Sequence, residues 1–386
     1  MGRSKRFAIV GAGIGGLSLA IAMQKKGFNV TVFENAQILK PIGAGLVLAG
    51  NAVKAFVEIG ISEEVLRAGS ILKKLSIKDP DGRILTETDS EKISARFHVV
   101  DSFTIHRADL HQVLLRHLND GTVQLGKYAV DFIQTPSDVK ITFQDGSSTV
   151  ADYVIACDGV HSLFRKKLVP QSKPRYAGYT CWRAVINNIP PGLDINETSE
   201  TWGPGSRFGI APLSNGRLYW FACLNAKENN PVMRSYKIQE LLFHFGHFHP
   251  PIREIIRHTK DEQLIWNDII DIKPLKQFAF GNIVLMGDAA HATTPNLGQG
   301  ACMAIEDAAI LANAIAKYPT VEDAFIAFEK KRIQRTTSIV KNSWQLGRVA
   351  QLENRWLIKA RNALLRLTPS SVAEKQIKSL QEISFQ

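Results

Sequence analysis

The chain has 386 residues, of which 45% are hydrophobic and 22% charged, so it can bury a full core and is unlike a disordered or fibrous sequence. Lys and Arg outnumber Asp and Glu by 47 to 36, a net charge of +11, but no stripe of basic and aromatic residues indicates nucleic-acid binding. No apolar stretch is long enough to span a bilayer and no secretory signal is recognisable, so we expect a cytoplasmic protein.

The N-terminus predicts a strand, a helix and a second strand. Apolar residues 7–10 form a buried strand, 17–26 a helix that Gly27 ends, and 29–33 a second strand. Between the first strand and the helix stands Gly11-x-Gly13-x-x-Gly16, whose glycines permit a tight turn, approach of a pyrophosphate and close helix packing. Glu34 follows the second strand, where a carboxylate binds the hydroxyls of an adenosine ribose and repels a 2′-phosphate, which indicates FAD or NAD.

The rest of the chain alternates between helical and strand patterns. Residues 107–118 predict a helix, 139–143 and 148–150 a hairpin, and 153–156 a third buried strand. Between 178 and 274 strands dominate, including 180–186, 208–212 and 218–224, which indicates a second region built on a sheet. Residues 280–286 predict a fourth buried strand, 301–317 a helix, and 321 to the C-terminus mostly helix.

The cysteines and the C-terminal charge give weaker signals. Cys157, Cys181, Cys223 and Cys302 form no CxxC pair, so we interpret them as reduced thiols that mostly fill the core, and we expect no metal site. Residues 329–386 contain 12 basic and 4 acidic residues, a charge of +8. We interpret this tail as a solvated helical face, with weak contact to a membrane surface or a partner as the alternative.

Two later motifs carry a family resemblance. Residues 158–165 contain D-G-x-x-S-x-x-R, and residues 287–295 contain G-D-A-A-H-x-x-x-P. With the N-terminal glycine motif, they resemble in order and spacing the three signatures of class A flavoprotein monooxygenases, the family of para-hydroxybenzoate hydroxylase. Residues 295–307, P-N-L-G-Q-G-A-C-M-A-I-E-D, particularly resemble the salicylate hydroxylase, urate hydroxylase and zeaxanthin epoxidase branches.

The resemblance covers nearly the whole chain and implies an α/β fold. It implies a Rossmann-like, glutathione-reductase-like FAD-binding domain with an inserted sheet-based substrate domain and a C-terminal helical segment. We expect the FAD-binding domain in residues 1–75, 100–177 and 276–320, the substrate domain in 76–99 and 178–275, and the helical segment in 321–386.

The resemblance also implies a noncovalent FAD site. At the adenosine and pyrophosphate end it comprises Gly11, Ala12, Gly13, Gly16, Glu34, Asn35, Arg107 and Val130. At the ring end it comprises Gly43, Gly45, Asp288, Pro295, Gly298, Gln299, Gly300 and Ala301, where amides at a helix N-terminus stabilise the negative charge of the reduced flavin.

Several of these residues have a second interpretation. Asp158 and Arg165 either contact FAD and NAD(P)H or only shape the turn. Asp288 is alternatively a helix N-cap, and Arg107 a surface arginine. His291 is interpreted as structural, because noncovalent FAD is usual in the resembled family.

Substrate-side candidates come from the sheet region. Residues 176–183, Y-A-G-Y-T-C-W-R, resemble a segment of the salicylate hydroxylase branch, which makes Arg183 a candidate. Arg207 and Tyr219 are candidates because the positions that they resemble contact substrate in the urate hydroxylase branch. Arginines facing a flavin favour an anionic or electron-rich ring, whereas the alternative is an ordinary core face. Alternation places Tyr219 and Phe221 on one face of their strand and Leu218 and Trp220 on the other.

These features predict an FAD-dependent monooxygenase. The resemblance implies that NAD(P)H binds transiently and reduces FAD. It further implies that O2 then forms a C4a-hydroperoxide of the flavin, which hydroxylates a small planar aromatic or heteroaromatic substrate. The alternatives are an FAD-dependent epoxidase of an isoprenoid-type substrate and a flavin-binding protein that does not oxygenate. A hydrophobic pocket without a buried arginine favours the epoxidase. The sequence leaves open the substrate, the choice of NADH or NADPH, and the oligomeric state.

Overall fold

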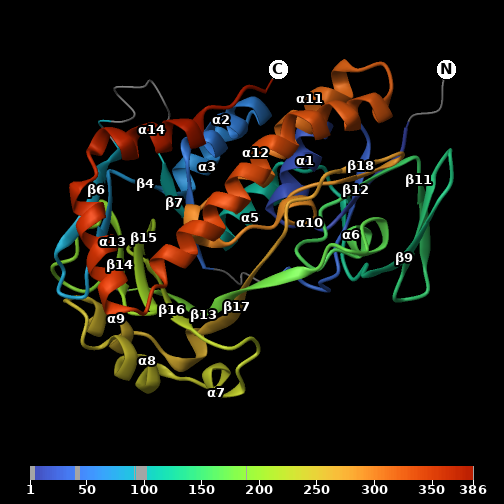
Figure 1. The fold of residues 1–386 in the computed structure, drawn as a ribbon. Helices are drawn as coiled ribbons and strands as arrows, with labels where there is room; N and C mark the ends of the chain where they lie inside the picture. The colour runs from blue at the N-terminus through green and yellow to red at the C-terminus, as the bar shows by residue number, and fades with distance from the viewer. Residues whose placement is uncertain (1–4, 40–43, 91, 93–101, 188, 386) are drawn as a thin grey trace.

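The computed structural model describes residues 5–39, 44–90, 92, 102–187 and 189–385, and its elements form two layered regions joined by a long helix (Figure 1). The first region is built on a six-stranded sheet in the order β18-β19-β12-β1-β2-β8. Its strands are β18 (Ala279–Phe280), β19 (Ile283–Leu285), β12 (Tyr153–Ala156), β1 (Phe7–Val10), β2 (Val30–Phe33) and β8 (Val123–Gln124). All neighbours are parallel except β18 and β19.

The fourth strand was predicted to be continuous over 280–286, and this prediction was wrong. The chain forms two short antiparallel strands, β18 and β19, which reverse at Gly281. Gly281 has a φ of 62°, a left-handed conformation that favours glycine and suits a tight reversal. The apolar run therefore makes a hairpin at the sheet edge, and only β19 joins the parallel ladder.

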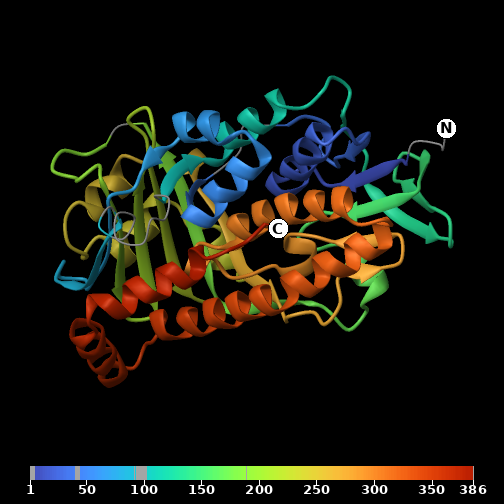
Figure 2. The ribbon, with the colours of Figure 1, turned by 90° about the horizontal axis from the view of Figure 1, so that it is seen from above.

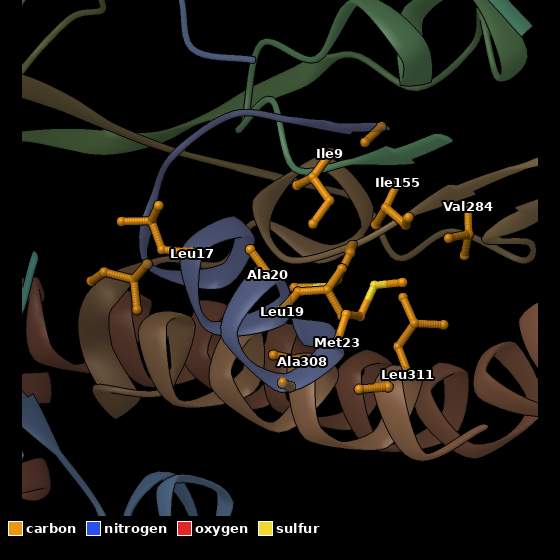
Figure 3. Close-up of a cluster of buried hydrophobic side chains, with 14 of the residues drawn as sticks. Ile9, Leu17, Leu19, Ala20, Met23, Ile155, Val284, Ala308 and Leu311 are labelled. Atoms are coloured by element: carbon orange, nitrogen blue, oxygen red, sulfur yellow. The ribbon is translucent and has the colours of Figure 1, made fainter. Parts of the chain in front are cut away.

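A helical layer covers one face of this sheet. Helix α1 (Ile14–Lys25) lies between the strands and α11 (Gly300–Lys317), as Figure 3 shows for Leu19 and Met23 beneath Ile155 and above Leu311. Small residues such as Ala308 let the two helices approach, and α1 is buried along nearly its whole length. Helices α2 (Gly50–Ile59), α3 (Ser62–Ala68) and α5 (Arg107–Arg116) extend the layer.

Two three-stranded sheets flank the first region. One has β11 (Ser148–Ala151), β10 (Val139–Phe143) and β9 (Ala129–Gln134), and its first two strands are the predicted hairpin. The other has β3 (Gly45–Leu48), β7 (Phe103–His106) and β4 (Ser70–Ile71). Short helices α6 (Leu163–Leu168) and α10 (Asp288–His291) follow β12 and β19 at the carboxyl ends of the parallel strands.

The second region is a seven-stranded, mostly antiparallel sheet in the order β17-β13-β16-β15-β14-β5-β6. Its strands are β17 (Ile265–Ile272), β13 (Pro174–Ile186), β16 (Leu218–Asn225), β15 (Ser206–Pro212), β14 (Glu197–Gly203), β5 (Lys74–Lys78) and β6 (Ile84–Asp89). One face packs on α8 (Ile238–Phe245) and α9 (Ile252–Arg257) through a core that includes Trp182, Phe208 and Trp220. The opposite face turns towards the first region, and α7 (Pro231–Arg234) lies at the periphery.

The C-terminal helices connect the two regions. Helix α12 (Val321–Ala350) runs along both of them, and α13 (Arg355–Leu367) and α14 (Ser370–Gln381) turn back from its end (Figure 2). Gln351, just after α12, accepts a hydrogen bond from Arg207 of β15 at 2.9 Å, which ties this helix to the sheet. The predicted domain limits stay predictions, although sheet strands already begin at Lys74 and Pro174.

Candidate functional site

The glycine motif forms a turn that only glycine can make. Gly11 has a φ of 107°, and a Cβ there would lie 2.3 Å from the Cys157 carbonyl oxygen. A Cβ on Gly16 would lie 2.0 Å from the Gly11 carbonyl oxygen, so this position requires close approach of helix and strand. At Gly13 a Cβ would meet nothing within 4 Å. The turn is thus tightly packed on one side and open at the N-terminus of α1, where a pyrophosphate fits.

Glu34 lies beside this turn. Its two carboxylate oxygens accept hydrogen bonds from the backbone nitrogens of Ala12, at 2.8 Å, and Ala36, at 2.9 Å. These bonds hold the carboxylate at the carboxyl end of β2, next to the open side of the turn. Asn35 is exposed beside it. The Lys127 amide donates to the Glu34 carbonyl at 2.7 Å, so the chain runs past this end of the site just before β9 begins. The exposed Val130 is the second residue of β9.

Asp288 stands at the carboxyl end of β19 as the first residue of α10. Asp288 has exposed surface, but the atoms packed around its carboxyl raise its pKa, and the nearby charges of His291, Arg107 and Arg165 oppose that shift. Arg107 begins α5 and is itself exposed. Asp288, Arg107 and Arg165 come from chain segments far apart in sequence, and the structure brings them to the same edge of the parallel sheet. This arrangement of an accessible carboxylate and an accessible guanidinium can bind hydroxyl and phosphate groups.

Asp158 and Arg165 hold the neighbouring turn. Asp158 Oδ2 accepts a hydrogen bond at 2.8 Å from the amide of Leu163, the first residue of α6, and so satisfies a free N–H group of that helix. Arg165 is buried, and its Nη1 donates to the Ala289 carbonyl at 3.1 Å. The side chain of Arg165 therefore supports α10, which carries Asp288. Of the two sequence interpretations, these contacts favour the one in which the motif shapes the site.

A buried ionic network, which sequence reasoning missed, anchors α10 from behind. Asp307 of α11 accepts from the Gly287 amide at 2.9 Å, from His291 Nε2 at 2.6 Å and from Arg332 Nε at 2.6 Å. Neighbouring Glu306 pairs with Arg332 at 2.7 Å and Arg335 at 2.6 Å. Asp307, Glu306 and Arg332 have no exposed surface. These contacts give His291 a structural environment.

The signal for this network was present in the sequence. Glu306 and Asp307 interrupt the apolar run of α11, and adjacent acids in a buried helix need partners. Asn51 extends the network by donating to Glu306 at 2.5 Å and to Gln299 Oε1 at 2.9 Å. The ionic network therefore reaches the loop before α11.

That loop, residues 295–300, presents backbone towards open space. Pro295 begins a short 3-10 turn (Pro295–Leu297), and Gly298 follows with a φ of 64° and an exposed surface. A Cβ on Gly298 would meet nothing within 4 Å, and Gly300 begins α11. The N–H groups of the first turn of a helix have no partner within that helix. Gly300 and Ala301 thus offer amides where a flavin ring edge would carry negative charge.

Asn296 in this loop joins the first region to the seven-stranded sheet. Its Oδ1 accepts from Tyr179 Oη at 2.9 Å and from Arg207 Nη2 at 2.8 Å, and its Nδ2 donates to the Ser343 carbonyl at 2.8 Å. A Cβ on Gly347 of α12 would lie 2.4 Å from Asn296 Nδ2, which shows how closely α12 approaches. The loop is therefore held from two sides by side-chain contacts.

The three substrate-side candidates share one face of the sheet. Strand pairing aligns Arg183 with Phe221, and Ala211 with Tyr219, and puts Arg207 opposite Cys223. Tyr219 and Phe221 belong to one small apolar cluster, whereas Leu218 and Trp220 lie in the core on the other face, which confirms the predicted alternation. Tyr219 touches β3, since a Cβ on Gly45 would lie 2.5 Å from its ring. Gly43 lies outside the described residues.

The two arginines differ in their availability. Arg207 is buried and is occupied by Gln351, Asn296 and the carboxylate of Glu200, the last at 3.6 Å. Arg183 is half-buried and has no carboxylate partner among the described residues. Burial raises the pKa of the Tyr219 phenol, so this group stays protonated and can donate. Arg183 interacts with the Cys181 thiol and, like Tyr219, stands on this face without a carboxylate partner in the described part of the chain, whereas Arg207 is a positioning residue.

A cavity of about 120 Å³ adjoins the loop at Gly298 and Gln299. Its wall is mainly aliphatic and combines β3, β5 and α14, with Val47, Leu72, Leu75, Leu297 and Leu380 as its apolar members. Ala49, Ser90, Ser102 and Gln381 complete the described lining, which contains no charged side chain. The space beside the loop therefore suits an uncharged, apolar group.

The comparisons with known proteins decide the family. A family model described as "FAD binding domain" matches residues 6–343. The chain belongs to this family. The open glycine turn, the exposed Asp288 and the amides beyond Pro295 fit FAD, and the relatives of this monooxygenase are FAD-dependent enzymes of aromatic and heteroaromatic compounds. Within the described residues, no cluster of His, Cys, Asp or Glu could hold a metal ion.

Individual relatives match nearly end to end. The monooxygenase is 35% identical over 365 residues to the aurachin C monooxygenase/isomerase of Stigmatella aurantiaca, covering 94% of each chain. It is 33% identical over 367 residues to the 2-heptyl-3-hydroxy-4(1H)-quinolone synthase of Pseudomonas aeruginosa, again covering 94% of each. It superposes on HpxO of Klebsiella pneumoniae, complexed with FAD and uric acid, with a TM-score of 0.89 and 26% identity, covering 98% of this chain and 96% of the HpxO chain.

These matches confirm the predicted family, α/β fold, FAD cofactor and monooxygenase activity. NAD(P)H is the reductant typical of the family. The individual FAD and substrate contacts assigned to residues of this chain stay predictions.

Proposed function

We propose that this monooxygenase inserts one oxygen atom into a lipophilic heteroaromatic substrate, a 4(1H)-quinolone or a ring of similar shape that carries an alkyl chain. The observation that carries the proposal is the aliphatic cavity beside Gly298 and Gln299, whose described lining has no charged group. A small polar substrate has no apolar group to place in such a cavity. A hydrocarbon chain gains about 0.8 kcal/mol of binding free energy for each methylene that it buries there.

The relatives support the same substrate class. The quinolone synthase of P. aeruginosa is named for a product with a heptyl chain, and it is 33% identical to this chain over nearly its whole length. The ring would lie against the sheet face of Arg183 and Tyr219, both of which carry donors that would bond a ring oxygen. Arg207, through Asn296, would keep the loop of residues 295–300 in register with that face.

FAD, when bound and reduced by NAD(P)H, supplies the activation of oxygen that protein side chains cannot perform. The chain contributes position and dryness. Glu34 and the glycine turn would hold the adenosine and pyrophosphate, Asp288 the ribityl chain, and the amides of Gly300 and Ala301 the electron-rich ring edge. The closely packed contacts between Gly45 and Tyr219 would exclude water from the side of the sheet.

The isoprenoid epoxidase is less well supported. The described lining of the cavity contains no arginine, which taken alone favours the epoxidase, but the sheet face that would hold the ring carries Arg183 and the buried Arg207 beside Tyr219. A polar ring edge, rather than a hydrocarbon alone, matches this face better.

A series of 2-alkyl-4(1H)-quinolones tests the proposal. We expect substrate-stimulated NAD(P)H oxidation with a KM that falls about fourfold per methylene, from ~0.8 kcal/mol each, until the cavity is filled. Leu380→Trp in the cavity wall should remove the chain-length dependence and keep turnover of the methyl compound, whereas the exposed Val372→Trp in the same helix should change neither. Equal KM values along the series, or no stimulation by any member, would contradict the proposal.

A further inference from the structure

Helix α13 turns an apolar stripe towards solvent. Trp356, Leu364 and Leu367 are 62%, 69% and 79% exposed, and Leu357 is also exposed. Positions 356, 360, 364 and 367 follow the spacing of three and four residues that puts side chains on one face of a helix. Large exposed apolar side chains that gather on one helix face mark an interaction surface, whereas singly scattered ones are normal.

The opposite face of α13 fixes the helix to the protein. Arg361 is buried, donates to the carbonyls of Val349 and Ala350 at 3.2 and 3.1 Å, and lies 5.2 Å from the ring of Trp202. Asn354 caps the helix by accepting from the Trp356 amide at 2.9 Å. The buried face that contains Arg361 thus fixes the orientation of α13, and the apolar stripe faces solvent. Figure 2 shows α13, in red, at a corner of the molecule beyond the end of α12.

Positive charges border the stripe on one side. Arg355, Lys359 and Arg366 follow the same helical spacing and lie next to the apolar positions. Arg355 and Lys359 both approach the Trp356 ring to 5.0 Å. Arg366 also pairs with Asp79 at 2.9 Å, and Glu353 before the helix is bonded to Asn225 at 2.8 Å. Helix α13 itself contains no acidic residue.

From this geometry we infer that α13 docks the enzyme on an anionic lipid surface. A helix with an apolar stripe and a basic flank lies in the plane of a membrane interface, with its apolar side chains among the acyl chains and its basic ones at the headgroups. Tryptophan is favoured at that depth. Docking of this kind is peripheral, because no described helix is long and apolar enough to cross a bilayer.

A second copy of the chain fits this surface less well. A stable protein interface buries about 800 Å² on each partner, which takes roughly 20 to 30 residues, and α13 has 13 residues with only one free side. Two α13 helices facing each other would also bring their basic flanks together without an acid in either helix. Anionic lipid offers the opposite charge as well as an apolar interior.

The docking helix is connected to the cavity wall through α14, whose far end borders the cavity. Only Thr368 and Pro369 separate α13 from α14, and Leu380 and Gln381 of α14 line the cavity beside Gly298. A lipophilic substrate dissolved in the bilayer would thus meet the enzyme about one helix length, the 12 residues of α14, from its cavity. This consequence rests on the proposed function, whereas the docking itself does not.

Vesicle flotation of the full-length, FAD-loaded enzyme tests the inference. We expect the enzyme to float with vesicles of phosphatidylcholine and phosphatidylglycerol, to bind phosphatidylcholine alone far less, and to release when the ionic strength rises from about 0.1 to about 1 M, since the Debye length then falls from ~10 to ~3 Å. Trp356→Ser with Leu364→Ser and Leu367→Ser should weaken binding at least about tenfold, since each buried side chain of this size contributes more than that factor.

Matched controls separate docking from general effects. Phe243→Ser removes an aromatic residue that is 82% exposed on α8 and should leave flotation unchanged. Arg355→Gln with Lys359→Gln should weaken binding to anionic vesicles, whereas Lys140→Gln with Lys173→Gln, two exposed lysines elsewhere, should not. Flavin content and circular dichroism report that each variant is folded, and neither depends on the substrate.

Three results would overturn the inference. The first is a wild-type enzyme that stays at the bottom of the gradient with anionic vesicles. The second is a triple-serine variant that floats as well as wild type. The third is an enzyme that does not bind vesicles but sediments as a dimer that the triple-serine variant breaks, because the stripe would then bind a second copy.

Discussion

Replacing Asp307 by Asn should loosen the turn that carries Asp288. The carboxylate is fully buried and accepts from the Gly287 amide, His291 and Arg332. Breaking a buried pair costs about 3–5 kcal/mol, and Arg332 keeps Glu306 at 2.7 Å, so we expect a loss near the lower end, about 3 kcal/mol. FAD should be retained more weakly, because Gly287 positions Asp288.

The pH dependence of the same residue sharpens this prediction. Burial alone would raise the pKa of Asp307, but the charges of His291 and Arg332 outweigh it and lower the pKa to about 2. A lowered folded pKa means that the carboxylate stabilises the fold above the unfolded value of about 4, and that this stability is lost as the pH falls towards 2. The loss amounts to about 2–3 kcal/mol in wild type and should be absent from Asp307→Asn.

Urea unfolding of the apoprotein, followed by tryptophan fluorescence between neutral pH and pH ~2, measures both effects. Asp145→Asn is the control, since Lys127 also lowers the pKa of that exposed carboxyl to about 2 but solvent screens it. The reasoning is refuted if Asp307→Asn unfolds within about 0.5 kcal/mol of wild type at neutral pH, or if its stability falls in acid as steeply as that of wild type.

Three further substitutions address the two ends of the site. Gly45→Ala puts a Cβ 2.5 Å from the Tyr219 ring, an overpacking of about 1–3 kcal/mol, so steady-state kinetics should show a KM raised about tenfold, and flavin content should fall as well because Gly45 is also predicted at the ring end of the FAD site. Asp288→Ala removes an accessible carboxylate and should raise the Kd of FAD at least about tenfold in a fluorescence titration, with unchanged circular dichroism; full flavin occupancy after dialysis would count against its role. Glu34→Ala should weaken FAD similarly and would also free the Ala12 amide, so an unchanged Kd would refute the adenosine assignment.

Local patterns predicted most of the fold. The glycine motif between β1 and α1 acts mostly within a few residues, because Gly16 meets the Gly11 carbonyl of the motif itself, whereas Gly11 meets Cys157 after the neighbouring strand β12. Alternation likewise placed Tyr219 and Trp220 on opposite faces, since side chains of a strand alternate wherever it lies. The apolar run 280–286 misled because a hairpin of two short strands has the same composition as one longer strand.

The parts that could not be predicted depend on pairing between distant segments. Arg207 has the residue type of a substrate ligand, but Gln351, 144 positions away, and Asn296, 89 positions away, occupy it. In the sequence Asp307 is an acid with no evident partner, but in the structure Arg332 Nε of the next helix donates to its Oδ1 at 2.6 Å. The periodicity of apolar residues does not predict which distant residues pair. Sequence patterns therefore indicate that a buried polar residue needs a partner, and the fold determines which residue that partner is.

The most direct test of the central claim is the fate of oxygen during turnover of a 2-alkyl-4(1H)-quinolone. Under 18O2, with NAD(P)H and the purified FAD-loaded enzyme, mass spectrometry of the product should show a single labelled oxygen atom on the ring, with one NAD(P)H consumed for each product molecule. Label that appears only in hydrogen peroxide, or product oxygen drawn from water, would contradict oxygenation at the loop beyond Pro295.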